Sequence, residues 1–419
     1  MRTIIWHTTV IVLALSILAG CATTPPPAEA VLAHDTSDQV HLDRIDEALV
    51  YGESQEAFER LFHRVQYQLM SPEQADFIQA RVAEWPDQNR ALPSSWFRAR
   101  SAPLRPALVR TLNLRGWSEE RLLAWWETPA FQAVLPHLTI LNLRGSLLGI
   151  QGYLALAENL RLSRVTHLYL GETTAGDAEL GVLAAVEDLP LQELHLDGNP
   201  ISDAGLVANF DSSLFSSLRV LNLSRTEVTA SGLSEFLTGR MTETLEALLL
   251  SGIALGRDKG GDPAPLTDIK PLPGLRVLDL QSTGLTDADL QILAEAPLLR
   301  SVEVLRLSGN HIGRGVALLL ESGEMHHLTT LSFDEVLEAE VIEELVHASS
   351  FSFLRVLAVD VADEEAALEL LSADLSSLEV LCIADVVIFD RRKRNCDPLP
   401  GNCQHSTDPR QPLHGFPID

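Results

Sequence analysis

One stretch near the middle of the 419-residue chain decides the fold: Leu191-Gln192-Glu193-Leu194-His195-Leu196-Asp197-Gly198-Asn199-Pro200-Ile201. Leucines occupy its first, fourth and sixth places, and an asparagine occupies its ninth. The same spacing recurs in Thr111-Leu112-Asn113-Leu114-Arg115-Gly116 and again in Ile140-Leu141-Asn142-Leu143-Arg144-Gly145. A short pattern repeated at even intervals is typical of a solenoid, in which each copy forms one structural unit.

Eleven copies of the pattern begin 24–30 residues apart. Their first residues are Val109, Leu138, Val165, Leu191, Leu218, Leu245, Leu275, Val302, Leu328, Leu354 and Leu378. No unit of this length can bury its own apolar side, so neighbouring units must stack and the two ends of the array need caps.

Each unit combines two periodicities. Leucines two residues apart alternate inward on a short strand, and the residues between them face outward. The second half is helical, as in residues 181–186 and 316–320. Strands stack about 4.8 Å apart, whereas helices need about 8–10 Å, so the array must bend with its strands on the inside. The sequence therefore predicts an α/β horseshoe with parallel strands on the concave face and helices on the convex face.

The ninth place of most units carries a short polar side chain. These residues are Ser146, Thr173, Asn199, Thr226, Thr283 and Asn310. Such side chains can bond the backbone groups that become buried where each strand ends. Ile253 and Val336 stand at the same place and cannot do so, which predicts local irregularity in their coils.

The units beginning at Leu191 and Leu275 resemble leucine-rich repeats of the ribonuclease-inhibitor-like kind. The resemblance covers about two thirds of the chain. It implies the solenoid fold and says little about function. The last units depart from the pattern, because Glu338 and Glu364 stand where an aliphatic residue is expected. That departure puts the regularity of the C-terminal coils in doubt.

The remaining segments flank or interrupt the array, which we place at residues 108–390. Residues 40–107 show helical periodicity and are predicted to form a small N-terminal cap. Residues 391–419 carry the basic run Arg391-Arg392-Lys393-Arg394 and several prolines, which predicts an irregular tail. The insertion Gly256–Pro273 is expected to be a surface loop.

The first twenty residues form an apolar run that is short for a membrane span and suits a signal peptide. The run ends in Leu18-Ala19-Gly20-Cys21, which resembles the bacterial lipoprotein processing box. The resemblance implies cleavage before Cys21, a lipid on its sulfur, and anchoring in the cell envelope at the outer membrane. Residues 21–39 contain three consecutive prolines and are predicted to be a tether. An ordinary signal peptide with an incidental cysteine is the alternative.

Charge limits the partners. The chain has 31 Lys and Arg residues against 58 Asp and Glu residues, a formal net charge of −27. An acidic surface repels nucleic-acid phosphates and anionic lipid headgroups. We therefore expect neutral or cationic partners and no nucleic acid.

The sequence shows none of the common catalytic, nucleotide-binding or paired-cysteine motifs. His326-His327 is better explained by a turn than by a metal site, since no carboxylate or cysteine stands at ligand spacing. We expect no cofactor, no metal, no small-molecule substrate and no enzymatic activity.

The residues that face outward on the concave side change character along the array. The face begins with Arg115 and Arg144, continues through His167, Tyr169 and His195, and ends apolar and acidic. Arg and Tyr often anchor protein interfaces, because they bury a large area and still satisfy their polar ends. We expect these five residues to form one patch that contacts a protein partner. The alternative is that Tyr169 and the histidines are scattered surface residues.

Three further cysteines are Cys382, Cys396 and Cys403. An exported protein occupies an oxidising compartment, so pairing is expected. We predict a Cys396–Cys403 disulfide, because the prolines and the glycine between them can turn the chain. The alternative pairs Cys382 with one of the two tail cysteines.

The sequence favours a membrane-anchored protein-binding module. A structural envelope protein without a specific ligand is the second hypothesis. An enzyme of unrecognised type is the third.

Overall fold

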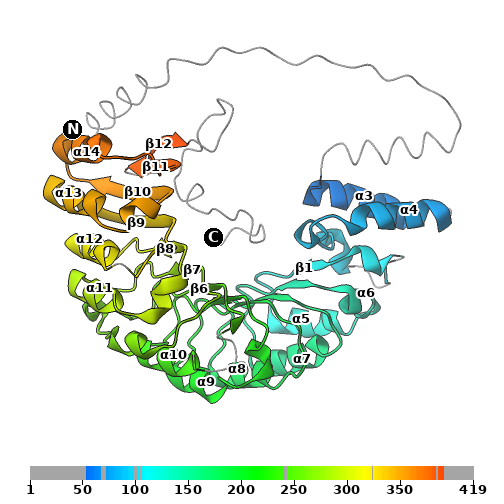
Figure 1. Ribbon diagram of the computed structural model, residues 1–419. Coiled ribbons are helices and arrows are strands. Elements are labelled where there is room, and N and C mark those ends of the chain that lie inside the picture. The colour runs from blue at the N-terminus through cyan, green and yellow to red at the C-terminus, as the bar shows by residue number, and fades with distance from the viewer. Residues whose placement is uncertain are drawn as a thin grey trace, which may run out of the picture.

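The computed structural model describes residues 53–67, 72–98, 102–103, 105–238, 243–322, 324–383 and 386–390. Within these ranges one twelve-stranded sheet runs in chain order from β1 to β12. The strands line the inside of a curved array and the helices cover its outside (Figure 1). The predicted leucine-rich-repeat horseshoe is confirmed.

The strands are short, and all neighbouring pairs except the last are parallel. Their bounds are β1 Thr111–Asn113, β2 Ile140–Asn142, β3 His167–Tyr169, β4 Glu193–His195, β5 Val220–Asn222, β6 Ala247–Leu249, β7 Val277–Asp279, β8 Val304–Arg306, β9 Thr330–Leu337, β10 Val356–Val361, β11 Val380–Ile383 and β12 Val386–Asp390.

The helices follow the strands around the outside, after two that precede the sheet. Their bounds are α3 Gln55–Tyr67, α4 Pro72–Ala83, α5 Glu119–Trp126, α6 Pro129–Val134, α7 Ile150–Leu160, α8 Asp177–Ala184, α9 Asp203–Ala208, α10 Ala230–Phe236, α11 Asp287–Leu293, α12 Arg314–Glu321, α13 Ala339–His347 and α14 Glu364–Ser372.

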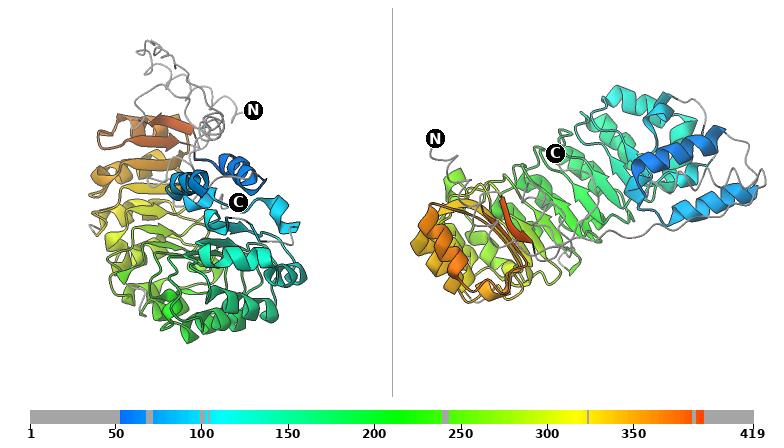
Figure 2. Two further views of the ribbon diagram at one scale, coloured as in Figure 1. Left: turned by 90° about the vertical axis from the view of Figure 1, so that its right-hand side faces the viewer. Right: turned by 90° about the horizontal axis from the view of Figure 1, so that it is seen from above.

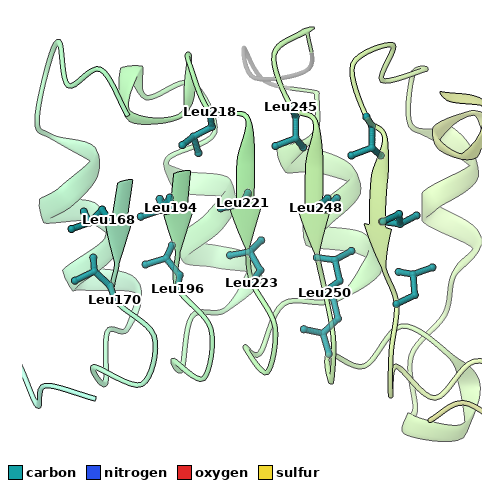
Figure 3. Close-up of a cluster of buried hydrophobic side chains, with 14 of the residues drawn as sticks. Leu168, Leu170, Leu194, Leu196, Leu218, Leu221, Leu223, Leu245, Leu248 and Leu250 are labelled. Atoms are coloured by element: carbon teal, nitrogen blue, oxygen red, sulfur yellow. The ribbon is translucent and has the colours of Figure 1, made fainter. Parts of the chain in front are cut away.

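The core is built from rows of leucines. Equivalent leucines of neighbouring strands, such as Leu168, Leu194 and Leu221, lie side by side and are fully buried (Figure 3). Burying one leucine side chain contributes about 1.5–3 kcal/mol relative to leaving it exposed. Since each coil covers the leucines of its neighbours, this stabilisation depends on stacking and not on any single unit.

Polar side chains at the ninth place bond the buried backbone, as predicted. The Asn199 amide donates to the carbonyls of Leu170 and Leu196, both at 2.8 Å. Its oxygen accepts from the amides of Thr173 and Ala175, both at 3.0 Å. Asn310 makes the equivalent four bonds four coils further on. These side chains therefore tie each coil to the one before it.

A second ladder, which the sequence did not predict, links helix starts across coils. Asp177 Oδ1 accepts from the Ser202 amide at 2.8 Å, and Asp203 Oδ1 accepts from the Thr229 amide at 2.7 Å. The first turn of a helix carries backbone amides without intrahelical partners. Each aspartate thus satisfies an amide at the start of the next helix.

The helices α3 and α4 close one end of the array (Figure 2). Phe58, Phe62 and Ile78 on α3 and α4 are buried in the same core as the repeats. Trp117 and Trp125 belong to this core and contact each other edge to face. The apolar end of the solenoid is therefore covered by aromatic side chains.

The coils of Ile253 and Val336 are irregular, as predicted. After Ile253 two short 3-10 helices, η7 (Arg257–Lys259) and η8 (Ala264–Asp268), replace the α-helix of neighbouring units. Strand β9 of the Val336 coil is longer than the strands before it, and its pairing with β10 shifts register.

Two other expectations need correction. Gly256–Pro273 is not a plain surface loop, because Leu266, Ile269 and Leu272 are buried in the core. Glu338 and Glu364 do not break the C-terminal coils, since they lie at the starts of α13 and α14. Negative charge is favourable at a helix N-terminus.

Candidate functional site

The strand register aligns the outward-facing residues as the sequence analysis expected. Asn142, Tyr169 and His195 are direct partners across β2, β3 and β4. His167 and Glu193 form the neighbouring row on the same face. Four of the five predicted concave residues, Arg144, His167, Tyr169 and His195, therefore come from three consecutive strands or the residues just after them.

Arg144 belongs to a group of four charged residues that we call the arginine network: Arg144, Glu172, Asp197 and Arg225. The Arg144 guanidinium donates to Asp197 Oδ2 at 2.6 Å and to Glu172 Oε1 at 2.9 Å. Arg225 approaches the same two oxygens at 3.3 and 3.0 Å. Two arginines and two carboxylates thus hold one another across four coils.

Arg144 reaches Asp197 by passing over the coil between them. That coil carries Gly171 at the equivalent place. A Cβ atom on Gly171 would lie 2.7 Å from Arg144 Nη1 and 2.6 Å from Asp197 Oδ1. The contact therefore requires a glycine at this position.

The second group, the histidine cluster, consists of His167, Tyr169, Glu193 and His195. His167 Nε2 and His195 Nε2 lie 3.5 and 3.8 Å from opposite oxygens of Glu193. The Tyr169 hydroxyl donates to Glu193 at 3.4 Å, and its ring stacks on His195 with centroids 4.5 Å apart. The Glu193 side chain is only 7% exposed. Burial, with the adjacent Glu193 charge, raises the pKa of Tyr169, so the phenol stays protonated.

Asn222 connects the two groups. Its amide nitrogen lies 3.4 Å from both His195 Nδ1 and Asp197 Oδ1. The other edge of His195 carries Nε2, which is buried and has no hydrogen-bond partner in the described part of the chain. The site is therefore a connected polar surface in which His195 Nε2 faces Glu193 at 3.8 Å without a hydrogen bond.

Arg115 follows β1 and stands at the same place as Arg144, one coil earlier. It also lines a pocket at the N-terminal end of the concave face, beside the cap. Contact of all five residues with one partner stays a prediction.

The later part of the concave face is more tightly packed than expected. Val220, Ala247, Val277 and Val304 form one row and are buried. Beside them, burial raises the pKa of Asp279, while the amide of Gln281 and Arg306 oppose that shift. This apolar row is a small side-chain cluster and offers little exposed surface.

Cys382 lies on β11, is buried and is disulfide-bonded. Cys21, Cys396 and Cys403, the other cysteines of the chain, all lie outside the described residues. The Cys396–Cys403 disulfide therefore stays a prediction. Within one chain it requires Cys382 to pair with Cys21, which excludes a lipid on the Cys21 sulfur. A lipid on Cys21 instead leaves Cys396 or Cys403 as the partner of Cys382, which is the alternative given above. Lipidation of Cys21 likewise lies outside the described residues.

The described ranges contain no group of three or more His, Cys, Asp or Glu residues placed to hold a metal ion. Nor do they contain a helix with the length and hydropathy needed to cross a bilayer.

Comparisons with known proteins bear on the fold. The leucine-rich repeat family model matches residues 189–208 and 216–237, which include β4 and β5. The chain has the leucine-rich-repeat fold. No curated protein sequence matches it significantly.

Solved structures of similar fold have low sequence identity. LegL7 from Legionella pneumophila is 19% identical over 67% of this chain and 99% of its own, with a TM-score of 0.42. The Rad7–Elc1 complex from yeast is 17% identical over 89% of this chain and 100% of its own, with a TM-score of 0.47. The TLR13–ssRNA13 complex gives 19% identity, with a TM-score of 0.38; the match covers 66% of this chain but 36% of that one. Identities this low say nothing about a shared function.

Sequence reasoning missed Glu172, Glu193, Asp197 and Arg225 as members of the site. Glu193 and Asp197 stand in the outward-facing rows, so the sequence places them on the concave face. It does not predict their partners, because pairing depends on how far each side chain reaches along the face. Glu172 and Arg225 lie one residue beyond those rows, at non-glycine residues with positive φ.

Proposed function

We propose that the protein is a protein-binding module whose partner docks on the concave face over β2–β5. The observation that carries the proposal is the connected polar surface formed by the arginine network and the histidine cluster. Its side chains hold one another in place before any partner arrives. Preorganisation of this kind lowers the ordering cost of association.

The energetics of the buried charges favour recognition over a purely structural role. Asp197 is 2% exposed and Arg144 is 13% exposed. Apolar side chains of similar size are often at least as stabilising as a buried ion pair. A leucine-rich interior offers such residues readily, so charges retained on the concave face are better explained by a partner that they orient.

The size of the face suits a protein. Eleven parallel strands about 4.8 Å apart give an inner arc of roughly 50 Å. An interface of standard size needs about 800 Å² on each partner. The strands β2–β5 provide part of this length, and the strands on either side can supply the rest of such an interface without a deep cleft.

We also propose that the module is anchored in a bacterial cell envelope through a lipid on Cys21. The support is the sequence Leu18-Ala19-Gly20-Cys21 together with the proline-containing segment that follows it. A lasting anchor needs more than one acyl chain, which lipidation of both the sulfur and the new amino terminus would supply.

Photo-crosslinking in cells tests the docking surface. A photoreactive residue is placed at Arg225, an exposed member of the arginine network, or at Glu235 on α10, the convex helix of the same unit. Both positions are exposed, and Arg144 still pairs with Asp197 when Arg225 is replaced, so both variants should stay folded. We expect a discrete crosslinked protein from position 225 and none from position 235. Equal yields from both positions, or a product only from 235, would contradict the proposal.

A further inference from the structure

A pocket of about 730 Å³ opens between the N-terminal cap and the first repeat. Its walls come from η2 (Ser94–Arg98), from β1 and the turn after it, and from α5. The lining residues are Ser94, Ser95, Phe97, Arg98, Asn113, Arg115, Trp117 and Arg121. A volume of this size is typical of small-molecule sites, which span about 300–1,000 Å³.

The pocket is cationic in a strongly acidic protein. Arg98, Arg115 and Arg121 line it, and none of its described lining residues is Asp or Glu. Within the described ranges, no carboxylate lies within ion-pair distance of Arg98 or Arg121. The nearby Glu119 instead accepts from the amides of Gly149 and Gly152 in the next coil. Most other arginines of the array are paired with carboxylates, so this local excess of positive charge is not a consequence of composition.

Aromatic rings fix the orientation of one guanidinium. The Arg121 guanidinium carbon lies 3.6 Å from the centroid of the Trp117 ring. Trp117 is in turn held by an edge-to-face contact with Phe97, at 5.0 Å between centroids. A guanidinium held over a ring face leaves its N–H groups available to bind an oxyanion in bidentate fashion.

From this geometry we propose that the pocket binds a ligand that presents two oxyanion groups, phosphate or carboxylate. Arg121 holds one group through its fixed donors, and Arg98 holds the other. Ser94, Ser95 and Asn113 supply neutral donors along the wall. The proposal is independent of the partner site over β2–β5. The same chemistry could come from a free anion or from acidic side chains of a polypeptide.

Isothermal titration calorimetry on the purified full chain tests the proposal, with inorganic pyrophosphate and a hexaglutamate peptide as separate probes. Low ionic strength is required, because salt screens exposed charges. We expect saturable binding of at least one probe. Tighter binding of pyrophosphate identifies a free anion as the source, whereas tighter binding of hexaglutamate identifies a polypeptide.

Arg98→Gln and Arg121→Gln should each weaken binding by about tenfold or more, since each removes charged hydrogen bonds. Arg121→Lys keeps the charge but removes the paired N–H donors of the guanidinium, so it should also weaken binding. The control is Arg314→Gln, which makes the same charge change at an exposed arginine of α12 paired with Glu344. Circular dichroism confirms that each variant is folded. Absence of binding by both probes, or binding that survives both glutamine substitutions, would overturn the proposal.

Discussion

Replacing Gly171 with alanine should break the contact on which the arginine network depends. The new Cβ would lie 2.6 Å from Asp197 Oδ1 and 2.7 Å from Arg144 Nη1. Carbon atoms do not approach polar atoms this closely, so one side chain must move. Arg144 is the longer and more exposed of the two, and it should withdraw.

The size of the destabilisation depends on the ion pair that Asp197 retains with Arg225. Removing one partner from a buried ion pair costs about 3–5 kcal/mol when nothing replaces it. Here Arg225 Nη2 remains 3.3 Å from the same Asp197 oxygen, and its side chain is 57% exposed. We expect it to offset roughly half of the loss. Gly-to-Ala also restricts the unfolded chain, which contributes about 0.4–1 kcal/mol in the opposite direction. The net destabilisation should be about 1–2 kcal/mol.

Urea unfolding followed by circular dichroism measures the change, with the m-value monitored because repeat arrays can lose two-state behaviour. The matched control is Gly181→Ala on α8, where an added Cβ meets no atom within 4 Å. That substitution should stabilise the chain by up to about 1 kcal/mol through helix propensity. The Gly171→Ala penalty should also shrink in an Arg144→Ala background, because the contact is already absent there. If Gly171→Ala proves as stable as Gly181→Ala, or costs the same in both backgrounds, the reasoning is wrong.

Three further predictions concern other parts of the molecule. Asn199→Ala should destabilise the chain by about 3 kcal/mol or more, since it leaves several buried backbone groups unpaired; Asn209→Ala, whose side chain bonds one carbonyl of α9, should cost about 1 kcal/mol in the same urea assay. Cys21→Ser should release the protein from the membrane fraction or leave it uncleaved, and unchanged fractionation would count against lipidation. Peptide mapping without reduction should yield a peptide linked through Cys382; a Cys382 peptide found only as the free thiol would contradict the disulfide seen in the structure.

The repeat period made most of the fold predictable. Once the units beginning at Leu191 and Leu275 were aligned, the rows of inward leucines and outward polar residues followed from strand alternation. The ninth-place side chains could be assigned because a turn with buried backbone groups needs a polar partner there. These features depend only on the place of a residue within one repeat, which can be counted directly from the sequence.

The parts of the site that the sequence did not reveal depend on distances between units. The reach of Arg144 to Asp197 spans an intervening coil, and the cationic pocket needs Arg98 from the cap beside Arg121 from the first unit. The buried leucines of the Gly256–Pro273 insertion were missed for the same reason. Neither helical periodicity nor strand alternation states which side chains from separate segments meet.

The glycines nevertheless supply part of the missing information. A Cβ on Gly205 or Gly232 would lie within 2.2 Å of Asp177 or Asp203, the residues that cap the next helix start, and Gly171 stands in the same relation to Arg144 and Asp197. In all three cases the side chain of one coil occupies the space where the next coil lacks a side chain. Gly205 and Gly232 lie on α9 and α10, whereas Gly171 follows β3, where neighbouring strands are only about 4.8 Å apart. In both settings a polar side chain can extend to the next coil only if the residue beside it is very small. A glycine at a row position, flanked by a charged residue one unit earlier, is therefore a sequence signal for a contact between coils. Applied to the outward rows, that signal identifies Arg144 and Asp197 as partners on either side of Gly171, which strand alternation alone could not do.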